Sequence, residues 1–122
     1  TGAARVAMGT DVPALFCNDD QLADSLIQYG TETEDPLWRL PLWAGYKSML
    51  KSTVADLSST GSTPYGGAIT AALFLEHFVE PNTPWAHIDL MSYNNNTRPG
   101  RPEGGEAQGL RGIYHMLKDR FS

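Results

Sequence analysis

The sequence GGAITAALFLEHFV, Gly66–Val79, is followed after a short proline-containing turn by WAHID, Trp85–Asp89. The glycine pair predicts a tight turn that leads directly into a helix. We expect this helix to span Ala68–Val79, and its apolar character on all sides predicts burial between layers or between subunits. A strand is predicted over Trp85–Met91, because its largely apolar sequence is typical of an interior strand in an α/β sheet.

Shorter signals precede this unit. Two apolar runs, Ala4–Met8 and Ala14–Cys17, predict strands on either side of a turn that contains glycine and proline. Asparagine and aspartate at positions 18–20 provide N-caps for a helix, in which apolar residues recur at helical spacing until Gly30 ends it. The acidic segment Thr31–Asp35 is expected to be a solvated loop. At this length the chain is one domain or a piece of one.

The middle of the chain combines extended and helical signals. Pro36 and Pro41 disfavour helix in the residues before them, so Trp38–Leu42 is expected to be extended. A helix is then predicted over about Leu42–Lys51. Val54–Leu57 is predicted to be a short strand or the entry to a turn.

The remaining segments are predicted to be two loops and a closing helix. Ser58–Gly67 is dense in serine, threonine, glycine and proline, and Ser92–Gly105 contains three asparagines and two Arg-Pro pairs. We expect Ser92–Gly105 to be an exposed loop. From Glu106 the spacing of apolar residues predicts a helix with one apolar face. That face consists of Leu110, Ile113, Tyr114 and Leu117.

The composition excludes several classes of protein. Hydrophobic residues make up 41% of the 122 residues, which is enough for a packed core and argues against disorder. The formal net charge of −5 argues against a nucleic-acid surface, because such a surface needs a basic face to replace phosphate counterions. Cys17 is the only cysteine, which excludes an intrachain disulfide and fits a cytoplasmic protein. No apolar segment reaches the roughly 20 residues that span a bilayer.

The histidines and two of the aspartates could be catalytic or metal-binding residues, or they could have a structural role only. His77, His87 and His115 lack the His-Glu-x-x-His spacing of a helical zinc site, and we interpret each as structural. Asp56 and Asp89 end or interrupt apolar runs, so we expect them to be partly buried and therefore hydrogen-bonded or paired. Each is either a catalytic or metal-binding group, or a carboxylate that caps loop amides or pairs with an arginine. We prefer the second interpretation.

Three other patterns give little support for a catalytic or ligand-binding site. The glycines before Ala68 are not followed by the lysine and hydroxyl residue that a phosphate-binding loop requires. No Gly-x-Ser-x-Gly nucleophile motif occurs. Trp38 and Trp43 form either a binding platform or, as is more common for tryptophan, part of a core or interface.

Five separated motifs resemble, in the correct order, the C-terminal part of the leucyl (cytosol) aminopeptidase family. They are Thr1-Gly2-Ala3, Trp38-Arg-Leu-Pro-Leu42, Ala55-Asp56 with Gly61, Gly67-Ala68 with Thr70-Ala71-Ala72, and Trp85-Ala-His-Ile-Asp89. Each motif alone is modest, but five in order are specific. The family's Asn-Thr-Asp-Ala-Glu-Gly-Arg metal motif would precede Thr1, which we interpret as a boundary made by cleavage or cloning.

The resemblance implies an α/β fold: the C-terminal portion of a three-layer α/β/α domain with a mixed central sheet. It also implies a cytoplasmic, hexameric enzyme that removes N-terminal residues from peptides with two divalent metal ions, zinc or manganese. The metal ligands and the catalytic lysine and arginine would lie before Thr1. Residues 1–122 are therefore expected to bind no metal and to be inactive alone. Their charge and the length of their apolar segments give the separate expectation that they bind neither nucleic acid nor a membrane.

Four residues match the family's substrate-binding positions. Gly2, Thr60 and Met91 would line the pocket for the N-terminal side chain, and backbone groups near Thr1 would hold the peptide. By this resemblance no residue of the chain is catalytic or metal-binding. The alternative is a non-catalytic α/β assembly or binding domain that keeps the fold, and the sequence before Thr1 would distinguish the two.

Overall fold

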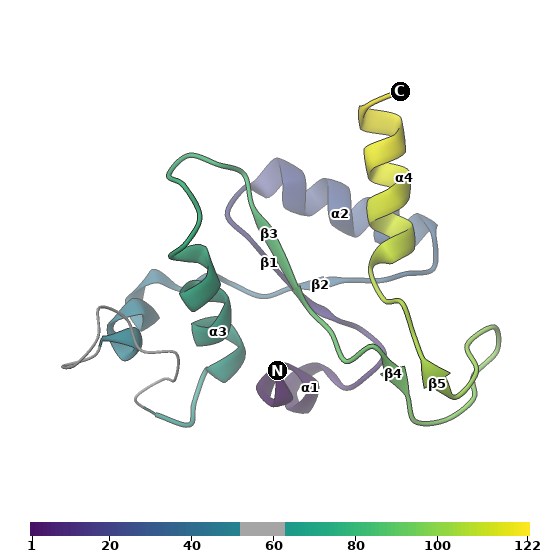
Figure 1. Ribbon diagram of the computed structural model, residues 1–122, viewed down its shortest axis with the longest axis horizontal. Helices are drawn as coiled ribbons and strands as arrows, with labels where there is room; N and C mark the ends of the chain where they lie inside the picture. The colour runs from purple at the N-terminus through teal and green to yellow at the C-terminus, as the bar shows by residue number, and fades with distance from the viewer. Residues whose placement is uncertain (52–62) are drawn as a thin grey trace.

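A mixed sheet organises the chain in a computed structural model that describes residues 1–51 and 63–122 (Figure 1). The sheet has three strands in the order β2-β1-β3, with β1 at Ala14–Cys17, β2 at Trp38–Arg39 and β3 at Ala86–Asp89. β1 runs parallel to β2 and antiparallel to β3. Every residue of β1 is buried, because this strand is paired on both edges and covered on both faces.

Helices cover both faces of the sheet. They are α1 (Gly2–Met8), α2 (Asp20–Glu32), the 3-10 helix η1 (Ala44–Leu50), α3 (Gly67–Glu76) and α4 (Leu110–Arg120). Leu15 and Cys17 pack in one core with α2 and α4, whereas Ala14 and Phe16 pack in a second core with α1 and α3. The two pairs of helices accordingly lie on opposite sides of β1 in Figure 1. The predicted layered α/β arrangement with a mixed sheet is confirmed. Among the described helices, none has the length and apolar content needed to cross a membrane.

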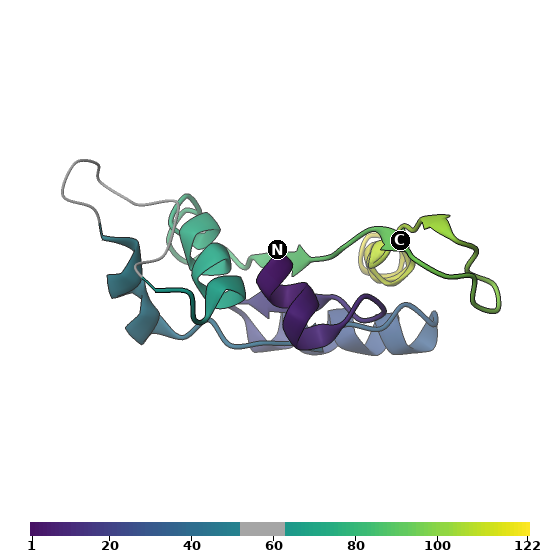
Figure 2. The same ribbon diagram turned by 90° about the horizontal axis from the view of Figure 1, so that it is seen from below.

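Local sequence explains where α2 and α3 begin. The Asp19 carboxylate accepts the backbone N–H of Leu22 at 2.8 Å and so caps α2. Gly66, with φ of 65°, provides the left-handed turn before α3. A Cβ on Gly67 would stand 3.1 Å from that of Ala3, so glycine permits the close approach of α3 to α1. Figure 2 shows these two helices side by side.

The prediction that Gly30 ends α2 is wrong, because the helix continues to Glu32. Gly30 instead lets α4 approach α2 closely. A Cβ on Gly112 of α4 would stand 3.0 Å from the Cα of Gly30. Two glycines therefore face each other where these helices cross.

The predicted strand over Ala4–Met8 is wrong, because these residues belong to α1. The Thr1 hydroxyl accepts the N–H of Ala4 at 2.9 Å and caps the helix. Ala4 is buried whereas Arg5 and Val6 are exposed, which is a helical rather than an alternating pattern. A short apolar run permits either structure, and here the cap and the packing of Ala4 determine the outcome.

The predicted closing helix starts later than Glu106 and buries only part of the predicted face. Gly109, with φ of 80°, precedes the first turn at Leu110. Gly112 and Met116 face the core, while Leu110 and Tyr114 are 61% and 58% exposed. Of the predicted apolar face, Ile113 packs against this core, and the close approach of Gly112 to Gly30 places the Gly112 side of α4 against α2.

Three further expectations need correction. Within the described residues β3 is an edge strand rather than an interior one. The predicted loop Ser92–Gly105 contains a small antiparallel sheet, β4 (Tyr93–Asn94) and β5 (Gly104–Gly105). The helix predicted over Leu42–Lys51 is the tighter η1. Val54–Leu57 and the first half of Ser58–Gly67 lie outside the described residues.

Candidate functional site

A hollow between the start of α1 and the end of β3 brings together two of the predicted substrate-binding residues. Thr1 and Met91, from distant parts of the chain, both line it, together with Asp89 and Gln108. The sheet provides Asp89 at the end of β3, and Met91 follows it by two residues. The hollow therefore depends on the packing of α1 beside the sheet.

Gly2, another of the predicted substrate-binding residues, does not line this hollow. Gly2 lines a neighbouring, more apolar hollow with Val6, Leu40 and Tyr65. Thr60 and the candidate carboxylate Asp56 lie outside the described residues. The structure thus brings together two of the four positions.

Asp89 is buried, as the sequence predicted, and is 6% exposed. Its Oδ1 pairs with the ammonium group of Thr1, the first residue of the chain, and accepts a hydrogen bond from it. Its partner is therefore the backbone at the start of α1, and not an arginine. In the part of the chain that the structure describes, Asp89 Oδ2 has no hydrogen-bond donor.

His87 lies on β3 between two aromatic rings. Its ring centroid is 6.0 Å from that of Phe16 and 6.2 Å from that of Trp85, and both pairs are stacked. Burial lowers the pKa of His87 below 6.5, and the Asp89 carboxylate partly opposes this effect. A neutral, stacked imidazole agrees with the structural interpretation of this histidine.

Metal-ligating side chains do not cluster in residues 1–51 and 63–122. No group of three or more His, Cys, Asp or Glu there lies close enough to hold a metal ion. His77 follows the end of α3 against Phe78, and His115 is exposed on α4. Trp38 and Trp43 are also exposed, so neither packs in a core formed by the described residues.

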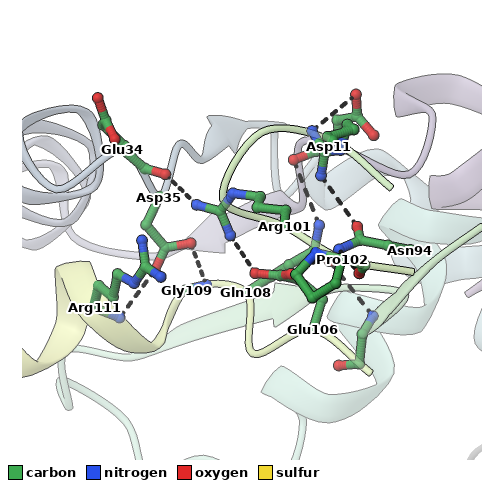
Figure 3. Close-up of polar contacts among 12 residues, drawn as sticks. Asp11, Glu34, Asp35, Asn94, Arg101, Pro102, Glu106, Gln108, Gly109 and Arg111 are labelled. Carbon is green, nitrogen blue, oxygen red and sulfur yellow. Dashed lines mark hydrogen bonds and ion pairs between the residues drawn. The ribbon is translucent and has the colours of Figure 1, made fainter. Parts of the chain in front are cut away.

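A polar network holds the segment that follows the hollow (Figure 3). Arg101 pairs with Glu106, and their side chains are only 16% and 11% exposed. Glu106 also accepts from the side-chain amide of Asn94 at 2.7 Å. Arg98 donates to Asn94 at 3.1 Å and pairs with Asp11 at 3.2 Å. These contacts join the β4–β5 segment to the turn that precedes β1.

Asp35 anchors the other end of this segment. It is 2% exposed, and it accepts the backbone N–H groups of Gly109 at 2.8 Å and of Arg111 at 2.9 Å (Figure 3). The prediction that Asp35 belongs to a solvated loop is therefore wrong. Gln108 donates to the carbonyl of Thr10 at 2.8 Å and so closes one side of the hollow. Sequence reasoning missed these roles because each partner is remote in the chain.

The layered fold, with a mixed sheet between helices, is that of an α/β protein, and comparison with known proteins identifies its family. A family model described as "Cytosol aminopeptidase family, catalytic domain" matches residues 1–114. The chain belongs to the cytosol aminopeptidase family, and it corresponds to the C-terminal part of the catalytic domain.

Curated relatives agree with this assignment. The probable cytosol aminopeptidase of Chlorobium limicola is 41% identical over 118 residues, which is 97% of this chain and 23% of that protein. The corresponding protein of Parasynechococcus marenigrum is 45% identical over 119 residues, 96% of this chain and 24% of that protein. The chain thus spans about a quarter of the length of these relatives.

Solved structures show the same fold. The cytosol aminopeptidase of Coxiella burnetii matches with a TM-score of 0.93 and 52% identity, over 100% of this chain and 27% of that one. The bottromycin maturation enzyme BotP, solved in complex with Mn, matches with a TM-score of 0.93 and 36% identity, over 98% of this chain and 27% of that one.

Proposed function

We propose that this chain is the C-terminal portion of a two-metal leucyl-type aminopeptidase, which hydrolyses N-terminal residues from peptides. The family match over residues 1–114, with a TM-score of 0.93 to the Coxiella burnetii enzyme, carries this proposal. The two divalent metal ions, zinc or manganese, would polarise the scissile carbonyl and activate the attacking water. The manganese complex of the related BotP supports a divalent metal in this protein.

In this proposal the chain contributes scaffold and substrate-pocket wall. Thr1, Gly2, Thr60 and Met91 are the proposed substrate-binding residues. Thr1 and Met91 line one hollow of about 10 Å³, which supports their being neighbours in the pocket wall. A methionine side chain suits such a wall because its flexible thioether adapts to apolar groups of different shape. A Cβ on Gly2 would meet no atom of the described residues within 4 Å, so Gly2 borders open space.

The metal ligands and the catalytic lysine and arginine are proposed to precede Thr1 in a longer protein. Residues 1–122 would then hold one wall of the pocket without the reacting centre. They would bind neither substrate nor metal productively when separated from that part.

The test compares the longer protein with residues 1–122 alone, each supplied with Mn²⁺ or Zn²⁺ and a leucyl amide. We expect the longer protein to release leucine and residues 1–122 to release none. Hydrolysis by residues 1–122 would contradict the proposal that the reacting centre lies before Thr1. A metal-loaded longer protein that cleaves no aminoacyl amide, or that lacks the Asn-Thr-Asp-Ala-Glu-Gly-Arg motif, would overturn the enzymatic proposal.

We also propose a homohexamer located in the cytoplasm, as the family resemblance implies. Large exposed apolar side chains support additional packing partners for this chain. They include Val6, Tyr65, Phe78, Leu110 and Phe121. Sedimentation of the longer protein tests the hexamer, and a monomer at micromolar concentration would contradict it.

A further inference from the structure

Asp89 is buried in a way that packing alone does not explain. Its side chain is 3% exposed, yet among the described residues only Oδ1 has a donor, the ammonium group of Thr1. No donor among residues 1–51 and 63–122 reaches Oδ2. A buried polar atom without a partner destabilises a fold, and an apolar side chain of the same shape avoids that cost. The contact made by Oδ1 is therefore the feature that needs an explanation.

Rigid elements hold both ends of this contact. Asp89 lies opposite Ala14 in the register of β3 with the fully buried β1. Thr1 caps α1 by accepting the N–H of Ala4 at 2.9 Å. The contact can be kept in a longer protein, where this nitrogen is a peptide amide that offers Oδ1 one N–H without the charge of the ammonium group. It is therefore compatible with residues that precede Thr1.

The contact also fixes the geometry of the proposed pocket wall. Thr1, Asp89 and Met91 line one hollow, and Gly2 continues the backbone from Thr1. Without Oδ1, the first residues of α1 would lose their direct link to the strand end that carries Met91. A shift of about 1 Å in such a wall is enough to impair catalysis.

We propose that Asp89 is a positioning residue, which fixes the substrate-binding backbone at Thr1 and Gly2 against the wall at Met91. This inference rests on the proposed aminopeptidase function. The side chain of Asp89 is 3% exposed among the described residues, so the proposed role is exerted through Thr1 and not by contact with the substrate. The proposed role is distinct from the catalytic and metal-binding roles that the sequence left open for this carboxylate.

The experiment uses the longer, metal-loaded protein with Asp89→Leu, Asp89→Asn and the control Asp24→Asn. Leucine has nearly the shape of aspartate without its oxygens, while asparagine keeps an acceptor for Thr1. Asp24 is an exposed carboxylate on α2. For a leucyl amide we expect Asp89→Leu to raise KM about tenfold and to lower kcat less than about threefold. Asp89→Asn should return KM to within about threefold of the parent, and Asp24→Asn should leave it unchanged.

A second measurement does not depend on activity. Amide hydrogen exchange over residues 2–4 should be about tenfold faster in Asp89→Leu and close to the parent rate in Asp89→Asn. A protein with no peptidase activity would therefore refute the proposed function while exchange still tests the contact.

Two results would overturn the positioning role. One is an Asp89→Leu variant with the parent's KM and exchange rates. The other is a variant whose activity falls only in proportion to the folded fraction, with KM unchanged. If Asp89→Leu fails to fold, Asp89→Ala is judged by the same two criteria, with Asp89→Asn as the rescue.

Discussion

Asp35 and Gly109 are joined by a hydrogen bond of 2.8 Å between the carboxylate Oδ1 and the backbone N–H, across 74 residues of sequence. The other carboxylate oxygen accepts the N–H of Arg111 at 2.9 Å. These donors lie at the start of α4, where backbone N–H groups have no partner within the helix. A loop that follows α2 therefore caps a helix near the other end of the chain.

Replacing Asp35 with alanine should lower the free energy of unfolding by about 2 kcal/mol, because it leaves buried N–H groups without an acceptor. Urea denaturation measures this change. Asp24→Ala, at an exposed position of α2, is the matched control and should change stability by less than about 0.5 kcal/mol. Equal effects of the two substitutions would contradict the capping role.

Gly112→Ala should separate α4 from α2. The added Cβ would stand 3.0 Å from both the Cα and the nitrogen of Gly30, which are backbone atoms that cannot rotate away. We expect a loss of about 1–3 kcal/mol from this overpacking, measured by thermal unfolding. Gly105→Ala provides the control, since a Cβ there meets no atom within 4 Å. A Gly112→Ala protein as stable as the parent would show that the helices do not pack this closely.

The ion pair of Arg101 and Glu106 should show strong coupling in a double-mutant cycle. Glu106→Gln or Arg101→Met alone leaves one mostly buried charge unpaired and should cost about 3 kcal/mol. The double variant should cost clearly less than the sum of the single ones, because it removes both charges. Additive free energies of unfolding would mean that the pair is exposed to solvent.

His87 should make stability depend on pH. Burial is the main cause that lowers its pKa below 6.5, so the unfolded chain takes up a proton at a higher pH than the folded chain does. The free energy of unfolding should be greatest above pH 6.5, and should fall as the pH drops from 6.5 towards the folded-state pKa.

The measurement for this histidine is urea denaturation from about pH 5 to about pH 8 for the parent, His87→Phe and His115→Gln. His87→Phe should lose the part of the pH dependence below neutrality that the parent shows. His115 is exposed on α4, and its replacement should leave the profile unchanged. A steeper fall in His87→Phe than in the parent would contradict the assignment.

Much of the fold was predictable because its signals are local. The strand at Ala14–Cys17 and the helix of α3 follow from uninterrupted apolar runs, and Asp19 caps α2 as its position predicts. The motifs carried the family assignment because they keep their order along the chain. Thr1 and Met91 could be named as neighbours only through that resemblance.

The remaining features depend on contacts between remote residues. Arg101, Glu106 and Asp35 look like ordinary surface charges in the sequence, and only the folded chain brings them to buried partners. The orientation of α4 is set by the meeting of Gly30 and Gly112, which periodicity within either helix does not reveal. The strand predicted over Ala4–Met8 failed because five apolar-rich residues suit two structures equally well.

The central strand β1 has a consequence for how the chain folds. Its alternate side chains pack in two separate cores. Leu15 and Cys17 lie in one, and Ala14 and Phe16 lie in the other. A slip of one residue against β3 would exchange the two sets and place each in the wrong core. Because β3 is formed far along the chain from β1, this pairing carries a large loop-closure entropy. The register of these two strands therefore determines the packing of both helical layers together. A wrong register would misfold the whole domain and not only the segment around the two strands.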